Sequence, residues 1–69
     1  MTSAPQPEHS SAEEFVNEIL GVAVTVRASD IHIEPLIQEF RVRFRIDGVL
    51  QERWRRPLHE YEAVLNRIK

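Results

Sequence analysis

Three arginines with the spacing of one strand face are the residues of this sequence best suited to chemistry. Arg41, Arg43 and Arg45 alternate with apolar residues across positions 40–46, so a β-strand would carry them on one side. A planar guanidinium donates paired hydrogen bonds to a phosphate or carboxylate, and neighbouring guanidinium groups add their fields. The row predicts either an anion-binding face or a solvated sheet surface whose arginines pair with nearby acids, such as Asp30, Glu34 and Glu39.

A second alternating set contains Asp30, His32 and Glu34, side-chain types that also bind metal ions. Three same-face positions of a strand span too much length to converge easily on one ion, at about 3.3 Å per residue. We therefore expect no metal site and a structural, hydrogen-bonded role for His32. The sequence shows no nucleophile with a base and an orienting group, and with only two glycines it has no glycine-rich phosphate loop. No catalytic residue is predicted in this chain.

The composition limits the class of protein. A chain of 69 residues without cysteine makes at most one small domain, with neither disulfides nor thiolate metal sites. Its net charge of -2 and pI near 5.9 argue against a nucleic-acid partner, which would favour a basic excess. The longest uncharged apolar run, residues 19–26, is too short to cross a bilayer and lacks the flanks of a signal peptide. These features predict a cytoplasmic protein.

The first helix is predicted to begin at a capping box. Residues 1–10 have two prolines and no apolar periodicity, so we expect a disordered leader there and a folded subdomain over 11–69. In the sequence Ser-Ala-Glu-Glu, Ser11 and Glu14 can each bond the backbone N–H of the other. Apolar residues then recur at helical spacing up to position 26. This face comprises Phe15, Val16, Ile19, Leu20, Val22, Ala23 and Val26.

Alternation predicts three strands after this helix. Residues 30–34 form the first, with Ile31 and Ile33 facing the core, and Pro35 ends it or places it at an edge. Residues 36–39 connect it to the strand with the arginine row. A hairpin to a third strand turns at Asp47-Gly48, which is a strong short-range hairpin signal.

Two registers are open for this hairpin. A two-residue turn pairs Phe44 with Gln51, whereas a three-residue loop with a left-handed glycine pairs Phe44 with Leu50. The longer loop also places Trp54 opposite Phe40 and so gathers more apolar surface on one side, which makes it the preferred register. In that register the second and third arginines of the row have no carboxylate directly opposite.

The last part of the chain is predicted to be a second helix. Pro57 suits a helix start, and an apolar stripe follows it. The stripe consists of Leu58, Tyr61, Leu65 and Ile68, with Val64 beside it. This pattern reaches Lys69 without a glycine cap or a breaker, which predicts a fragment of something longer. The predicted fold is α+β, in the order helix, three strands, helix, with a small, mostly antiparallel three-stranded sheet.

Two motifs give the chain a family resemblance. "RASDIHIEP" at 27–35 and "VRFRIDGVL" at 42–50, followed by "LNRIK" at 65–69, resemble the N-terminal subdomain of the ATPases that drive type II secretion and type IV pilus assembly. The resemblance covers about residues 12–69. The structural residues of the two motifs are Asp30, His32, Glu34, Asp47 and Gly48.

The resemblance implies a hexameric parent protein in which a RecA-like ATPase domain, which uses ATP with Mg, follows this segment. By the matching positions, Arg43 and Arg45 would lie near the nucleotide phosphates at the inter-domain cleft. Arg41 is a third candidate that matches the family less closely, because family members often have other residues at that position. The chain ends before the family's Walker A and Walker B segments, so it is expected to be non-catalytic by itself. Arg27 stands where the family usually has glycine, which tightens the requirement on the turn.

The implied partners are the RecA-like domain of the same chain or of a neighbouring subunit, and the inner-membrane platform proteins of the machine. This places the parent in the cytoplasm, peripheral to the inner membrane. The segment would contribute arginines near the nucleotide and couple domain motion to the machine. The alternative is a stand-alone interaction module that uses its arginine face or its sheet edge, with no nucleotide role. A reading frame that continues into a Walker A loop would distinguish the two.

Overall fold

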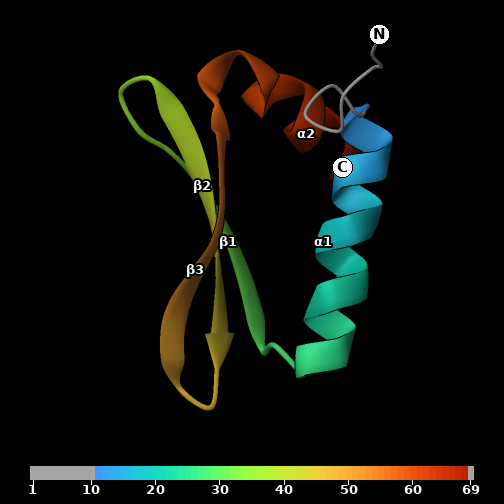
Figure 1. The fold of residues 1–69 in the computed structure, drawn as a ribbon, viewed down its shortest axis with the longest axis vertical. Coiled ribbons are helices and arrows are strands. Elements are labelled where there is room, and N and C mark those ends of the chain that lie inside the picture. The colour runs from blue at the N-terminus through green and yellow to red at the C-terminus, as the bar shows by residue number, and fades with distance from the viewer. Residues whose placement is uncertain (1–10, 69) are drawn as a thin grey trace, which may run out of the picture.

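The fold of residues 11–68, the part described by the computed structural model, is a three-stranded antiparallel sheet with helices before and after it (Figure 1). The predicted α+β class and element order are confirmed. The predicted leader at 1–10 lies outside the described residues. The elements are α1 (Ala12–Val26), β1 (Asp30–Pro35), β2 (Glu39–Ile46), β3 (Val49–Pro57), the 3-10 turn η2 (Leu58–Glu60) and α2 (Tyr61–Ile68).

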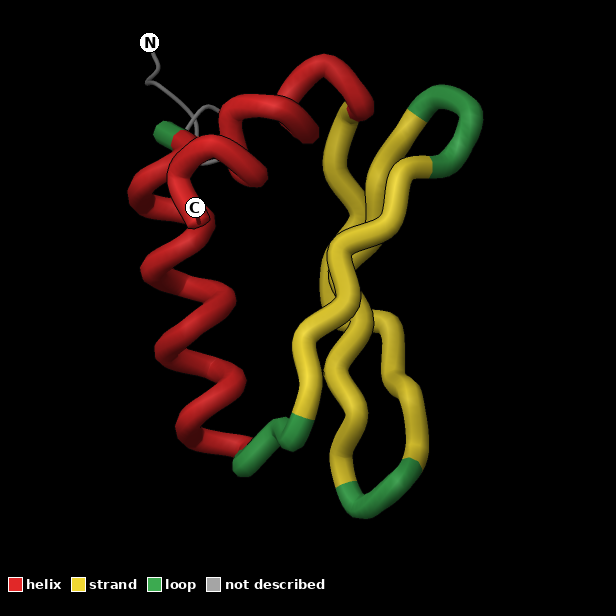
Figure 2. The backbone as a smooth tube through the Cα atoms, turned by 180° about the vertical axis from the view of Figure 1, so that it is seen from behind, coloured by secondary structure: helices red, strands yellow, loops and turns green. Residues whose placement is uncertain are grey.

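Both helices lie on the same side of the sheet, in which β2 is the central strand (Figures 1 and 2). α1 runs alongside the strands, and α2 lies near one end of the sheet. No described element covers the opposite side of the sheet. The fold therefore has two layers, and one sheet face is left open.

Local signals set both ends of α1. The Glu14 N–H donates to the Ser11 hydroxyl over 3.1 Å, and the Ser11 N–H donates to the Glu14 carboxylate over 3.2 Å, so the predicted capping box is formed. At the other end Arg27 adopts a left-handed conformation with φ 61°. The N–H groups of Arg27 and Ala28 donate to helix carbonyls, as in a Schellman motif. A left-handed residue thus ends α1 at the position where the family resemblance implies a glycine.

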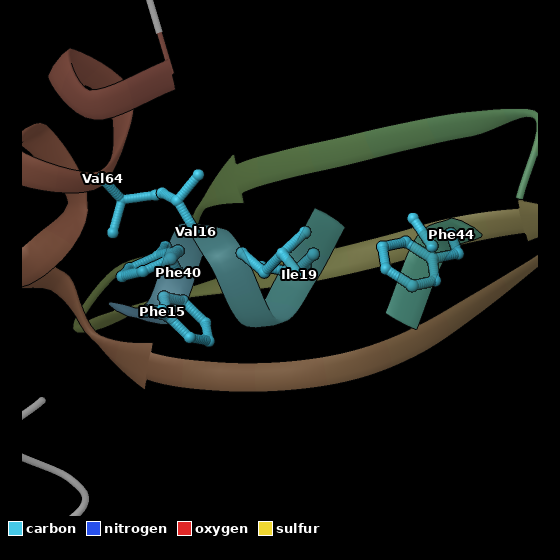
Figure 3. Packing of buried hydrophobic residues seen from close by; sticks show 8 residues of the cluster. Phe15, Val16, Ile19, Phe40, Phe44 and Val64 are labelled. Atoms are coloured by element: carbon cyan, nitrogen blue, oxygen red, sulfur yellow. The ribbon is translucent and has the colours of Figure 1, made fainter. Parts of the chain in front are cut away.

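The core lies between the inner sheet face and the helices. Among residues 11–68, eight apolar residues are buried there, and Figure 3 shows most of them packed between the elements: Phe15, Val16, Ile19, Ala23, Phe40, Val42, Phe44 and Val64. Phe40 and Phe44 are fully buried, as the alternation predicted. On α1, however, Leu20 is half exposed. On α2, Val64 is the buried residue rather than the predicted stripe beside it, and Ile68 is exposed.

The preferred hairpin register is wrong. Asp47 and Gly48 have φ of 52° and 82°, as a two-residue turn with two left-handed positions requires, and Phe44 pairs with Gln51. Further along, a β-bulge at Arg53 shifts the pairing and returns Trp54 to the inner face. There the Trp54 ring contacts Phe44 and Phe15 edge-on, with centroids 5.6 and 5.8 Å away.

The second helix begins later than predicted. Pro57 is extended, with ψ 143°, and is the last residue of β3. The chain then makes the turn η2 before α2 starts at Tyr61. An ion pair between Arg67 and Glu13, at 3.1 Å, joins α2 to the first turn of α1. Because Pro57 cannot donate a ladder hydrogen bond, its place at the end of an edge strand is a favourable one.

Candidate functional site

The open sheet face, called here the outer face, places the two sequence motifs side by side. The antiparallel register sets Arg41 opposite Glu34, Arg43 opposite His32 and Arg45 opposite Asp30. All three arginines therefore share this face with the outward residues of β1, as predicted from alternation. On the other flank, Arg45, Arg43 and Arg41 pair with β3. Their partners there are Leu50, Glu52 and Arg55.

Glu34 holds two arginines of the row. Its Oε1 accepts from Arg41 Nε and its Oε2 accepts from Arg43 Nη2, each over 2.8 Å. All three side chains are partly buried, with 25–33% of their surface exposed. The hydrogen bond from Arg43, followed by the one from Arg41, lowers the pKa of Glu34 below its ordinary value. Glu34 is thus a shared anionic partner for the first two arginines.

Arg45 is held more loosely. Its Nε donates to Asp30 over 3.2 Å, and its Nη1 lies 3.4 Å from the carbonyl oxygen of Gly48 in the hairpin turn. Both charged side chains are more exposed than those of the Glu34 cluster, at 39% and 55%. Exposed pairs of this kind exchange readily with solvent and contribute little to stability. Arg45 is therefore the most accessible guanidinium of the row.

A fourth arginine completes the charge pattern of the outer face. Arg55 donates two hydrogen bonds to Glu52, of 2.8 and 3.1 Å, and a third to Glu39 over 3.2 Å. The hydrogen bonds from Arg55 lower the pKa of Glu52. The bonds to Glu52, followed by the one to Glu39, raise the pKa of Arg55. Counting the described residues alone, the face thus carries as many carboxylates as guanidinium groups, so their formal charges balance. Its acids are Asp30, Glu34, Glu39 and Glu52.

Two buried nitrogens within this network have no hydrogen-bond partner among the described residues. They are Nε2 of His32 and Nε of Arg43, which belong to residues directly opposite each other in the ladder. A buried polar atom without a partner costs free energy comparable to a lost hydrogen bond. For the hydrogen-bonded role predicted for His32, the described residues therefore supply no partner at Nε2. While Arg43 bonds Glu34 through Nη2, the hydrogen-bonding capacity of its Nε is not satisfied.

The arginine row lies on an open surface. A shallow hollow of about 1090 Å³ is lined by residues of the β1–β2 connection and the end of β3, and a smaller one of about 310 Å³ lies between α1 and α2. Neither is lined by Arg43 or Arg45. Phe40 and Phe44 are buried and cannot stack on a ligand. An anion bound to the row would need a second wall from elsewhere.

Sequence reasoning placed Arg41, Arg43 and Arg45 on one face but missed Glu52 and Arg55. Without the bulge, a two-residue turn would direct Arg55 to the inner face, so the register shift at Arg53 brings it to the outer one. The signal that could have revealed this is Trp54, whose burial requires an extra residue in β3. Within residues 11–68, no group of three or more metal-ligating side chains could hold an ion, and no helix is long and apolar enough to cross a membrane.

Comparison with known proteins confirms the family resemblance of the two motifs. A family model described as type II/IV secretion system protein matches residues 5–69. Over 55 residues the chain is 53% identical to the type IV pilus assembly ATPase PilB of Myxococcus xanthus, which covers 80% of this chain and 10% of that protein. It is 50% identical, with the same coverage, to type II secretion system protein E of Xanthomonas campestris.

A further relative extends the match along the chain. The type IV pilus assembly ATPase TfpB of Acinetobacter baylyi is 42% identical over 65 residues, which is 94% of this chain and 11% of that protein. The chain thus spans about a tenth of the length of the curated relatives it matches. Because the family model covers nearly all of it, and the two motifs form one continuous sheet face, this chain belongs to the type II/IV secretion system protein family.

Proposed function

We propose that this chain is the non-catalytic N-terminal subdomain of a hexameric ATPase of type II secretion or type IV pilus assembly. In this proposal Arg43 and Arg45, with Arg41 beside them, contact the phosphates of ATP–Mg bound by a RecA-like domain. That domain belongs to the same chain or to a neighbouring subunit. The observation that carries the proposal is the alignment of the three arginines on one open sheet face.

The geometry of the face favours a shared site over an independent one. Guanidinium donors fit a polyphosphate, which accepts several charge-assisted hydrogen bonds. The face is open, however, and its charges are balanced, so it would neither enclose a nucleotide nor attract one strongly by itself. A second lobe that brings the phosphates to Arg45 and Arg43 would supply the missing wall. We expect the parent protein to act in the cytoplasm, against inner-membrane platform proteins, without a nucleic-acid partner.

The test is the loss of both arginines in the full-length ATPase. Arg43→Ala with Arg45→Ala should reduce ATP hydrolysis at least about tenfold, because each removes a charge-assisted hydrogen bond to phosphate. Arg53→Ala with Arg67→Ala removes the same charge away from the outer face and should leave hydrolysis near the wild-type rate. Unchanged hydrolysis in the first variant, with thermal unfolding like that of the wild type, would exclude the phosphate contact.

One observation supports a second candidate function. Each arginine of the row already has a carboxylate partner, as in the surface of an interaction module without a ligand. In that case the outer face or the β1 edge, where Ile31 is partly exposed, would contact a partner protein. The variant with both Arg43→Ala and Arg45→Ala separates the two functions. In an interaction module it would weaken the contact with the partner protein without changing nucleotide affinity.

A further inference from the structure

Glu34 competes for Arg43 with any anion that approaches the same guanidinium nitrogen. One carboxylate oxygen accepts from Arg43 Nη2 over 2.8 Å, and the other accepts from Arg41 Nε over the same distance. A phosphate that contacts the Arg43 guanidinium through this nitrogen must therefore replace Glu34. Arg45 meets less competition, because its bond to Asp30 is longer and more exposed.

Within the described part of the chain, Arg43 also has a buried hydrogen-bond donor without a partner, whereas no such donor is found for Arg45. While Nη2 bonds Glu34, the Arg43 Nε remains buried without a partner among residues 11–68, opposite the equally unpartnered Nε2 of His32. Exchange of Arg43 from Glu34 to another anion therefore starts from an arrangement with an unmet hydrogen-bond donor.

We propose that Glu34 is a built-in counter-anion that occupies Arg43 until phosphate displaces it, and so sets the nucleotide affinity of the site. This inference rests on the proposed phosphate contact of Arg43 and Arg45. Arg45 meets the phosphate first, and Arg43 follows as it leaves Glu34. Glu34 is thus a positioning residue that keeps Arg43 from binding other anions while no nucleotide is present.

Glu34→Gln tests the inference in the full-length ATPase, with the affinity for a non-hydrolysable ATP analogue measured by calorimetry. The amide keeps the size of the side chain but removes the charge. We expect binding about fivefold tighter, the effect of releasing a partly exposed ion pair. The matched control is Glu39→Gln, which removes the same charge from the same face. Glu39 pairs with Arg55 rather than with Arg43. This control should change the affinity much less.

A second background shows whether the effect passes through Arg43. In an Arg43→Ala protein, Glu34→Gln should no longer tighten binding. The inference is wrong if Glu34→Gln leaves the affinity unchanged or weakens it. It is also wrong if Glu34→Gln tightens binding equally in the Arg43→Ala background, or if Glu39→Gln tightens binding as much as Glu34→Gln does. Should Glu34→Gln not fold, Glu34→Asp decides in its place. The shorter aspartate side chain cannot span both arginines, so this variant should also bind the ATP analogue more tightly than the wild type.

The inference can fail separately from the proposed function. If Arg43→Ala alone weakens nucleotide binding while Glu34→Gln has no effect, the phosphate contact stands and the role of Glu34 does not. If Arg43→Ala and Arg45→Ala both leave the affinity unchanged, the proposed function fails, and the role of Glu34 fails with it.

Discussion

At the scale of single residues, Glu34 links the ionisation of the outer face to folding. Its pKa is lower in the folded chain than its ordinary 4.5, because Arg43 and Arg41 donate to the carboxylate. A group with a depressed folded-state pKa stabilises the fold fully above its unfolded pKa, and this contribution is lost as the pH falls through the folded value. The stabilisation by Glu34 should therefore be present at neutral pH and disappear in acid below pH 4.5.

Glu34→Gln should lower the free energy of unfolding at pH 7, and the deficit relative to wild type should shrink at a second, acid pH well below 4.5, as the wild-type carboxyl takes up its proton. Urea denaturation at the two pH values measures both quantities. Glu62→Gln, on α2 away from the outer face, is the charge-matched control. A deficit of the same size at both pH values would show that the effect does not come from the charge of Glu34.

Arg27 carries a backbone cost that glycine would avoid. It is the left-handed residue that ends α1, with φ 61°, and a side chain in that conformation costs about 1–2 kcal/mol. Replacing Arg27 by glycine would remove this cost, but part of the stabilisation is offset by the greater flexibility of glycine in the unfolded chain. Arg27→Gly should therefore raise the free energy of unfolding by about 0.5–1 kcal/mol, whereas Arg27→Ala should not. A thermal or urea melt in which the glycine variant is the less stable would contradict this account.

At the scale of elements, the stability of the fold depends on the contact between α1 and the sheet. Ile19 is 1% exposed in this contact, whereas Ile37, at the tip of the β1–β2 connection, is 91% exposed. Ile19→Ala should cost about 2–5 kcal/mol, which is comparable to the whole stability of a domain of this size. Ile37→Ala, the same chemical change, should cost less than about 0.5 kcal/mol. Equal urea midpoints for the two variants would contradict the assigned core.

Elements with strong local signals were predictable, and pairings that depend on distant residues were not. The capping box of Ser11 and Glu14 set the start of α1, and Asp47-Gly48 set the position of the hairpin. The register was missed because a bulge at Arg53 satisfies two demands that looked exclusive. The tight turn keeps its two left-handed residues, and Trp54 still reaches the core formed with α1.

The same limit applies to the candidate site. Period-two alternation was enough to place Arg41, Arg43 and Arg45 on one face. It could not show that β1 pairs with β2 so that Glu34 reaches two of these arginines. Side-chain ion pairs follow from register, and register follows from core packing around α1. The sequence named Asp30, Glu34 and Glu39 as possible partners of the row, but the order of residues alone could not show which acid each arginine contacts.

At the scale of the whole molecule, the two faces of the sheet carry different kinds of residues. The inner face and the helices form the core, while the other face holds a balanced set of arginines and carboxylates that no described element covers. The chain spans about a tenth of the length of its relatives, which are named as secretion and pilus assembly proteins. We infer that the outer face meets a nucleotide held by a second lobe of such a machine.

A structure of the full-length ATPase with Mg and a non-hydrolysable ATP analogue tests this claim most directly. The account predicts a guanidinium nitrogen of Arg43 or Arg45 within about 3 Å of a phosphate oxygen. It also predicts that the bond between Arg43 and Glu34 is broken in that state. The account would be contradicted by a structure in which nucleotide is bound, both arginines keep their pairs with Glu34 and Asp30, and the outer face is turned toward solvent.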